Sequence, residues 1–359
     1  MLTDHPALQL FSELLVASPS GREAALAAIV RQKLTEWDIA HEQDGMGNVI
    51  VRLNGRSPQA PLIMFAAHMD EIGLVVTKIN NDGSLQVNRT GGLHPWKLGE
   101  GPVEILGDRE TIVGVLSMGS THTANAANQA VTWNDVCVLT GLSPEQLKAA
   151  GVRPGSTGVP TRERRGPVLF GDPADPMVAA WTFDDRMGMV ALLRLLARLK
   201  EEGIRPSHPT IIAFTVSEEV GGHGAKSLAM REQPEIFISV DGAPIPPGTP
   251  LELDGRPAIW SKDRLGHYDQ PLLQALCQAA LDAGTELQPV VYQSAASDAS
   301  LVFYAGGAQR IACMGQVRAN SHGFEVARLS VFDHMLETLV QFVRGFGGGD
   351  YNEFQEATN

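Results

Sequence analysis

Residues 61–70 have the sequence PLIMFAAHMD, in which an almost wholly apolar run is followed by a histidine and an aspartate. An apolar run of this length is typical of a strand that is covered on both faces, as in a parallel sheet. Similar runs occur at 210–216 (TIIAFTV) and 235–240 (EIFISV), and a helix-like apolar stretch covers 186–202. Strands that alternate with helices predict an α/β fold, with a mostly parallel sheet and helices on both faces.

The sequence changes character between residues 72 and 175. Short runs of β-forming residues, such as GLVVTKI (73–79) and TIVGVLS (111–117), alternate there with Gly, Asn, Asp and Pro. This pattern predicts an inserted small β-barrel-like domain. We therefore expect an α/β catalytic domain made of residues 1–71 and 176–346, an inserted β-rich domain over 72–175, and a flexible tail over 347–359.

The composition limits the class of protein. Of 359 residues, 43% are hydrophobic and 19% charged, which is enough apolar side chain for a large buried core. The formal net charge of −13 argues against nucleic acid or an anionic membrane as the main partner. The three cysteines are widely separated, and neither a signal peptide nor a membrane-spanning apolar window is evident, so a cytoplasmic location is expected.

Histidines and carboxylates follow the predicted strands at their carboxyl ends. In open α/β sheets, ligands bind in the crevice beyond these ends, so the side chains are expected to gather at one rim. Every predicted strand contributes to this set; the strands are 61–67, 177–183, 210–216, 235–240 and, after a loop, 309–314. The set contains His68, Asp70, Asp184, Asp185, Glu218, Glu219, Asp241 and His322.

Taken singly, each of these motifs has a plainer explanation. His68 and Asp70 fit a polar turn, Asp184 fits a helix N-cap, and Glu218 with Glu219 fits a solvated pair. Ser20 and Glu23 similarly have the spacing of a capping box that opens a helix. The combination at the strand ends is more specific than any member, because placement and residue type agree at every strand.

Two histidines with several carboxylates suit zinc or cobalt, and also manganese. One carboxylate can bridge two ions about 3.5–4 Å apart, as in many hydrolases. Adjacent Glu218 and Glu219 would divide two roles, one as ligand and the other as general base. Asp70, two residues beyond His68, is placed to accept a hydrogen bond from the histidine ring and orient it.

At these residues the sequence resembles the tetrahedral aminopeptidases, a family of dinuclear metallopeptidases that includes glutamyl and deblocking aminopeptidases. The resemblance implies an α/β domain interrupted by a small β domain and two divalent metal ions per subunit. The matching stretches run through the whole chain: 19–23, 67–73, 91–92, 151–155, 183–188, 217–221, Asp241, 297–299, and His322 with Glu325.

The resemblance also implies residue roles. Asp184 would bridge the ions, Glu219 and His322 would complete one ligand sphere, and His68 and Asp241 the other. Glu218 would be the general base.

The expected activity is removal of N-terminal residues from peptides, by a homo-oligomer built from dimers that can form a tetrahedral dodecamer. The chain departs from the family pattern at His223, which would donate to a ligand or be inert, and in the residues that flank His322. These departures bear on substrate preference.

Two other functions stay open at this point. The same metal site would serve a deacylase or another amide hydrolase, and the chain could be a catalytically silent assembly protein. A glucanase is discounted, because a glycosidase needs two carboxylates that flank a sugar bond and has no need of a metal pair.

Overall fold

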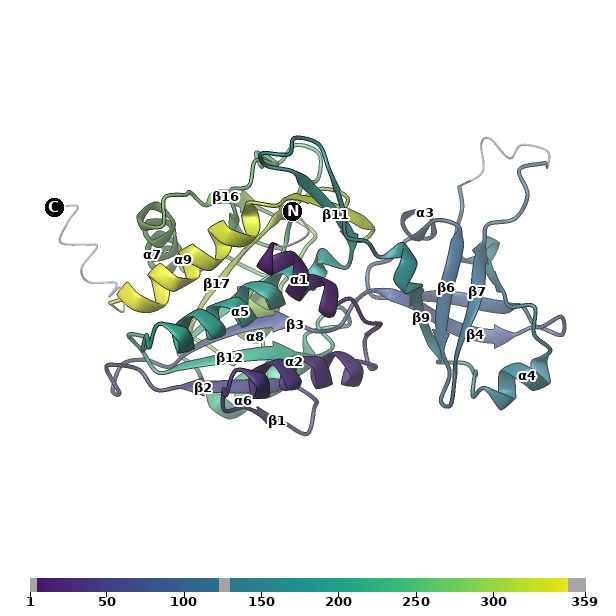
Figure 1. Cartoon of the computed structure of the whole chain (residues 1–359), viewed down its shortest axis with the longest axis horizontal. Helices are drawn as coiled ribbons and strands as arrows, with labels where there is room; N and C mark the ends of the chain where they lie inside the picture. Colours follow the sequence, from purple (N-terminus) through teal and green to yellow (C-terminus); the bar gives the residue numbers. More distant parts are fainter. Residues whose placement is uncertain (1–4, 123–129, 348–359) are drawn as a thin grey trace.

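The computed structural model describes residues 5–122 and 130–347, so the expected tail lies, apart from its first residue, outside the described residues. The α/β part is built on an eight-stranded sheet (Figure 1). In spatial order the strands are β1 (Glu42–Gln43), β2 (Val49–Leu53), β12 (Thr210–Thr215), β3 (Ile63–His68), β13 (Ile236–Val240), β17 (Arg310–Gly315), β15 (Ala258–Lys262) and β16 (Gln288–Val291).

The centre of this sheet is parallel. Strands β12, β3, β13 and β17 pair in parallel, whereas β2 and β15 join them antiparallel on either side. Every residue of β3, β12 and β13 is buried, as expected for apolar strands with both faces covered. The predicted α/β fold with a mostly parallel sheet is therefore confirmed.

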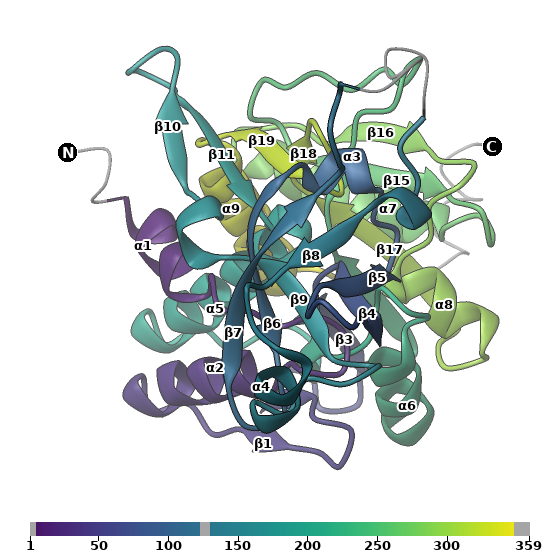
Figure 2. The same cartoon turned by 90° about the vertical axis from the view of Figure 1, so that its right-hand side faces the viewer.

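Helices cover both faces of the sheet. Helices α5 and α9 pack together, and α5 contacts β3 and β13, whereas α8 contacts β13 and β17 and packs against α6. Figure 2 shows α5 and α2 on one side and α6 and α8 on the other. In the described part of the chain, none of the helices combines the length and apolarity of a membrane span. Their bounds are α1 (Pro6–Glu13), α2 (Ala24–Glu36), α5 (Phe183–Glu201), α6 (His223–Glu232), α7 (Gln270–Asp282), α8 (Asp298–Tyr304) and α9 (Val331–Gly345).

A closed barrel lies beside the α/β part (Figure 1), as the β-rich segment predicted. It has its own hydrophobic core, which includes Leu74, Val103 and Val138. In order around the barrel the strands are β4 (Gly73–Ile79), β5 (Leu85–Thr90), β8 (Cys137–Leu139), β7 (Thr111–Ser117), β6 (Gly101–Leu106) and β9 (Thr157–Pro160), with the short helices α3 (Pro95–Leu98) and α4 (Pro144–Ala149).

The strand predicted before Asp184 lies in one of two smaller sheets, so its predicted place in the main sheet is wrong. The strand expected at 177–183 is β11 (Met177–Trp181), but it does not belong to the main sheet. It pairs antiparallel with β10 (Val168–Phe170) and β19 (Phe324–Arg328), while β14 (Ala243–Pro244) pairs with β18 (Val317–Arg318). A short apolar run shows that a strand is buried, but it does not say which neighbours the strand has.

A buried ionic network lies where the chain passes between the α/β part and the barrel. The carboxylate of Glu71 accepts hydrogen bonds from Arg165 Nη1 (3.0 and 3.2 Å), Trp181 Nε1 (2.9 Å) and the backbone N–H of Ser18 (2.8 Å). The side chain of Arg186 lies 3.7 Å from Glu71 and donates to the carbonyl of Met69. These contacts join the segments that enter and leave the barrel, so they hold it in one orientation beside the α/β part.

Candidate metal centre

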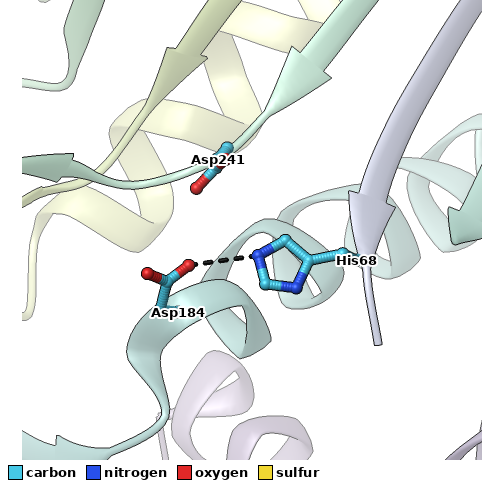
Figure 3. A group of neighbouring side chains, drawn as sticks. All are labelled: His68, Asp184 and Asp241. Atoms are coloured by element: carbon cyan, nitrogen blue, oxygen red, sulfur yellow. Dashed lines mark hydrogen bonds and ion pairs between the residues drawn. The ribbon is translucent and has the colours of Figure 1, made fainter. Parts of the chain in front are cut away.

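The five predicted ligands form two groups of donors that share Asp184. One group contains His68, Asp184 and Asp241 (Figure 3), and the other contains Asp184, Glu219 and His322. Within each group, one donor atom from each residue lies within 4.8 Å of the others. The shared carboxylate is the arrangement that a pair of metal ions requires.

His68 is the last residue of β3, and its ring is held in one tautomer. Nδ1 lies 3.0 Å from the backbone carbonyl of Asp70, and a carbonyl can only accept a hydrogen bond. Nδ1 therefore carries a proton and donates to this carbonyl, while Nε2 lies 3.1 Å from Asp184 Oδ1, on the side where a metal ion would bind. The Asp70 carboxylate, which we expected to orient this ring, is 3.5 Å from Nδ1, farther than the carbonyl of the same residue.

The Asp70 carboxylate holds the glutamate pair in place. It is fully buried and accepts hydrogen bonds from the backbone N–H groups of Glu218 (2.9 Å) and Glu219 (3.2 Å) and from the hydroxyl of Ser20 (2.6 Å). A carboxylate with these donors fixes the loop after β12, so that Glu218 and Glu219 face the site.

The capping box expected at Ser20 and Glu23 is therefore wrong. Helix α2 starts at Ala24 with Glu23 as its N-cap, and no side chain caps it. Glu23 Oε1 instead accepts from the backbone N–H groups of Gly21 (3.0 Å) and Ser217 (3.2 Å). Ser20 and Glu23 therefore form hydrogen bonds with Asp70 and Ser217, which flank the predicted ligands in sequence, rather than with each other's backbone.

Asp184 reaches the site from the start of α5 and has a buried arginine as a neighbour. Its Oδ1 faces His68, whereas Oδ2 lies 2.5 Å from Arg318 Nη2 and 3.5 Å from His322 Nε2. Arg318 is 2% exposed. Arg318 could not be recognised from the sequence, because an arginine in a short strand carries no signal until the fold places it beside a carboxylate.

His322 lies between β18 and β19 and is held by contacts from both parts of the molecule. Its backbone N–H donates to Glu325 Oε1 (3.1 Å), and Glu325 Oε2 accepts from the backbone N–H of Asp184 (3.0 Å). Its ring Nδ1 lies 3.2 Å from the carbonyl of Gly92, which belongs to the segment between β5 and α3. Nδ1 therefore carries a proton, and Nε2 faces Asp184 Oδ2 at 3.5 Å and Glu219 Oε2 at 3.9 Å.

The electrostatics of the cluster fit a cation. Burial raises the pKa of Glu218 well above its usual value, that of Glu219 to about 7 and that of Asp241 to about 6. Although burial lowers the pKa of His322, the carboxylates of Glu219 and Asp184 raise it to about 10. These pKa shifts mean that the cations within the cluster do not fully neutralise its carboxylates. Oε1 of Glu219 is also buried and has no hydrogen-bond partner among the described residues. The donor set thus fits divalent metal ions.

A pocket of about 420 Å³ opens onto both donor groups. Its lining includes Asp184, Glu218 and Asp241 of the donor cluster, and also Trp260, Arg264 and Ala295. His223 is the exposed first residue of α6, and within residues 5–122 and 130–347 its ring forms no hydrogen bond to a predicted ligand, so of its two expected roles the inert one is favoured.

Comparisons with known proteins agree with this geometry. The family model of the M42 glutamyl aminopeptidases matches residues 47–337. The glutamyl aminopeptidase of Lactococcus lactis is 28% identical over 242 residues, and the lysyl aminopeptidase of Pyrococcus furiosus is 32% identical over 212 residues. These matches cover 64% and 57% of this chain and the same shares of the relatives, so the chain spans less than two thirds of the length of either.

Among solved structures, the TET1 peptidase of Pyrococcus horikoshii, described as able to assemble into a tetrahedron or a large octahedral shell, superimposes with a TM-score of 0.81. It is 25% identical, and the match covers 94% of this chain and 98% of that one. The family resemblance expected from the sequence motifs is thus confirmed, and the chain belongs to the M42 glutamyl aminopeptidase family.

Proposed function

We propose that this chain is a metal-dependent aminopeptidase that hydrolyses N-terminal residues from peptides with two divalent metal ions per subunit. The observation that carries the proposal is the pair of donor groups that share Asp184, with the carboxyl group of Glu218 beside them in the same pocket. Zinc or cobalt suits these nitrogen and oxygen donors best, and manganese is a further candidate. When bound, the ions would polarise the scissile carbonyl and lower the pKa of a water molecule.

Glu218 is the group that we assign as general base. It belongs to neither donor group, it lines the pocket, and its backbone N–H is held by Asp70. Its carboxylate takes a proton from the attacking water and then gives it to the leaving amine. Since burial raises the pKa of Glu218, the carboxyl group holds this proton more readily than an exposed glutamate would.

Assembly and location belong to the same proposal. The similarity to the Pyrococcus horikoshii TET1 peptidase supports a homo-oligomer built from dimers, with a tetrahedral dodecamer as the candidate form. Peptides are the proposed partners, rather than nucleic acid or membrane. The acidic composition and widely separated cysteines support a cytoplasmic location.

A Glu218→Gln variant tests the proposed activity. Wild type and variant are loaded with zinc, cobalt or manganese and assayed with aminoacyl reporter substrates, with metal content measured on the same samples. We expect the variant to keep its metal and to lose roughly a hundredfold or more in kcat.

Acetate release from N-acetylated amino acids, measured on the same metal-loaded samples, separates a deacylase from an aminopeptidase. A fully metal-loaded wild type that cleaves only N-acetylated substrates would support a deacylase. If it releases no product from either substrate set, the hydrolase proposal is wrong and an assembly protein is favoured.

A further inference from the structure

The pocket is lined by an exposed arginine, Arg264, whose side chain forms no hydrogen bond or ion pair with the described residues. Arg264 follows β15 and lines the same pocket as Asp184 and Glu218. Within residues 5–122 and 130–347, no hydrogen bond or ion pair joins its guanidinium group to another residue; its backbone N–H alone is used. A free guanidinium group beside a ligand pocket is available to a ligand.

The neighbouring aspartate does not neutralise this arginine. Asp263 is fully buried, and its Oδ1 accepts from the backbone N–H groups of Leu265 (2.8 Å) and Gly266 (3.2 Å). Its Oδ2 accepts from the hydroxyl of Tyr268 at 3.1 Å. The Asp263 carboxylate is therefore used to build the turn, and the charge of Arg264 is left for the pocket.

The backbone of this turn is anchored to the pocket wall. The N–H of Arg264 donates to the carbonyl of Ala295 at 3.0 Å, and Ala295 lines the pocket as well. The hydroxyl of Tyr268 also lies 2.8 Å from that of Ser297, just beyond Ala295. The start of the Arg264 side chain is thus fixed at the wall, while its guanidinium group can reach a ligand.

The other arginine of the pocket is not available in this way. Arg318 is buried against Gly242, and its guanidinium group pairs with Asp184 at 2.5 Å and with Glu325 at 3.1 Å. Arg318 is therefore a fixed counter-charge of the donor cluster, whereas Arg264 is an exposed cation that lines the same pocket.

We propose that Arg264 binds a carboxylate of the substrate and that it determines substrate preference. Guanidinium and carboxylate groups match in geometry and form charge-assisted, often bidentate, hydrogen bonds. The inference rests on the proposed aminopeptidase function and adds the substrate class, peptides that present a carboxylate to this wall.

Two groups of a peptide can supply this carboxylate: the side chain of an acidic N-terminal residue, or the C-terminus of a dipeptide. The relatives named above carry names for N-terminal residues of opposite charge, glutamyl and lysyl, so their names do not decide between an acidic and a basic N-terminal residue. Arg264 favours the acidic substrate and repels the basic one.

The test uses the metal-loaded full-length protein and the variants Arg264→Met and Arg264→Glu, with Arg89→Met as a matched control. Arg89 is an exposed arginine of β5 that does not line the pocket. The p-nitroanilides of glutamate, leucine and lysine lack a C-terminal carboxylate, so they report on the side chain. Leu-Ala and its C-terminal amide report on the C-terminus.

Wild type should prefer the glutamyl over the leucyl anilide, and Arg264→Met should reduce this ratio of kcat/KM roughly tenfold or more. Arg264→Glu should turn the preference toward lysine, whereas Arg89→Met should leave every ratio unchanged. If the Arg264 variants change only the ratio between Leu-Ala and its amide, the carboxylate is C-terminal. Ratios that are the same in wild type and in both Arg264 variants overturn the proposal.

A binding measurement keeps the proposal testable if no anilide or dipeptide is hydrolysed. Calorimetry compares glutamic acid α-amide and Leu-Ala with leucine amide as ligands of the metal-loaded protein. Wild type should bind one of the carboxylate ligands more tightly than leucine amide, and Arg264→Met should lose the difference. Equal affinity for all three in wild type would reject the role of Arg264, whereas a retained difference without turnover would reject the aminopeptidase function alone.

Discussion

Replacing Gly92 with alanine should weaken one of the two proposed metal positions and spare the other. A Cβ atom at this position would lie 2.6 Å from both Cε1 and Nδ1 of the His322 ring. Because carbon atoms in contact are about 3.5 Å apart, the ring must move by roughly 0.9 Å. The backbone of Gly92 is not in the left-handed region, so alanine causes no strain of its own there.

The size of the effect follows from the tolerance of a metal site. Metal–ligand distances vary by only about 0.2 Å, so a displacement of roughly 0.9 Å removes the imidazole from its position. Loss of an orienting contact in a metal site typically lowers affinity about 10- to 100-fold, or about 1.4–2.7 kcal/mol. The loss should fall on the group of Asp184, Glu219 and His322, because His68 and Asp241 do not contact Gly92.

The assay is calorimetric titration of the metal-free protein with zinc or cobalt, fitted to two sites. Wild type should bind two ions, and Gly92→Ala should bind one ion with unchanged affinity and the other about 10- to 100-fold more weakly. Gly45→Ala is the matched control, since its added Cβ has no atom within 4 Å and its φ is ordinary.

Two results would refute this reasoning. Wild-type affinity at both positions in Gly92→Ala would mean that His322 is not a ligand. Equal weakening of both positions, together with a lower unfolding temperature of the metal-free variant, would mean that the substitution acts through the packing of the barrel against the α/β part.

Three further outcomes are expected. Glu71→Gln removes the buried partner of the Arg165 guanidinium group and leaves it only the more distant carboxylate of Glu104, so urea denaturation of the metal-free protein should show a loss of about 3–5 kcal/mol, and a loss under about 1 kcal/mol would contradict this. Arg318→Gln removes a buried cation from the donor cluster, so titration should show tighter binding of at least one metal ion; constants that are unchanged or weaker would count against it. A hydrogen bond with His5 contributes most to lowering the pKa of Asp333 to about 2. Since the unfolded value is about 3.9, the stabilisation is present above about pH 4 and is lost as the pH falls toward 2, and Asp333→Asn should flatten the pH dependence of the unfolding free energy in that window.

Much of the fold and of the candidate site could be predicted from local sequence. The apolar runs of β3, β12 and β13 identify buried parallel strands, because a strand covered on both faces is built mostly from apolar residues. His68 and Asp241 were found with them, since each stands at or directly after the carboxyl end of its strand.

The tertiary structure decided the remaining features. The sequence predicted that the strand before Asp184 belongs to the main sheet. This strand is β11, which instead pairs with β19, a strand about 150 positions further along the chain. The carbonyl of Gly92 holds the ring of His322 across 230 positions, and Arg318 pairs with Asp184 across 134. Periodicity reports which face of an element is buried, but it carries no information on the partner that buries it. The sequence by itself therefore determined the elements and the donor residues at their ends, and only the folded chain decided which of them meet, because contacts between distant residues depend on how whole elements pack.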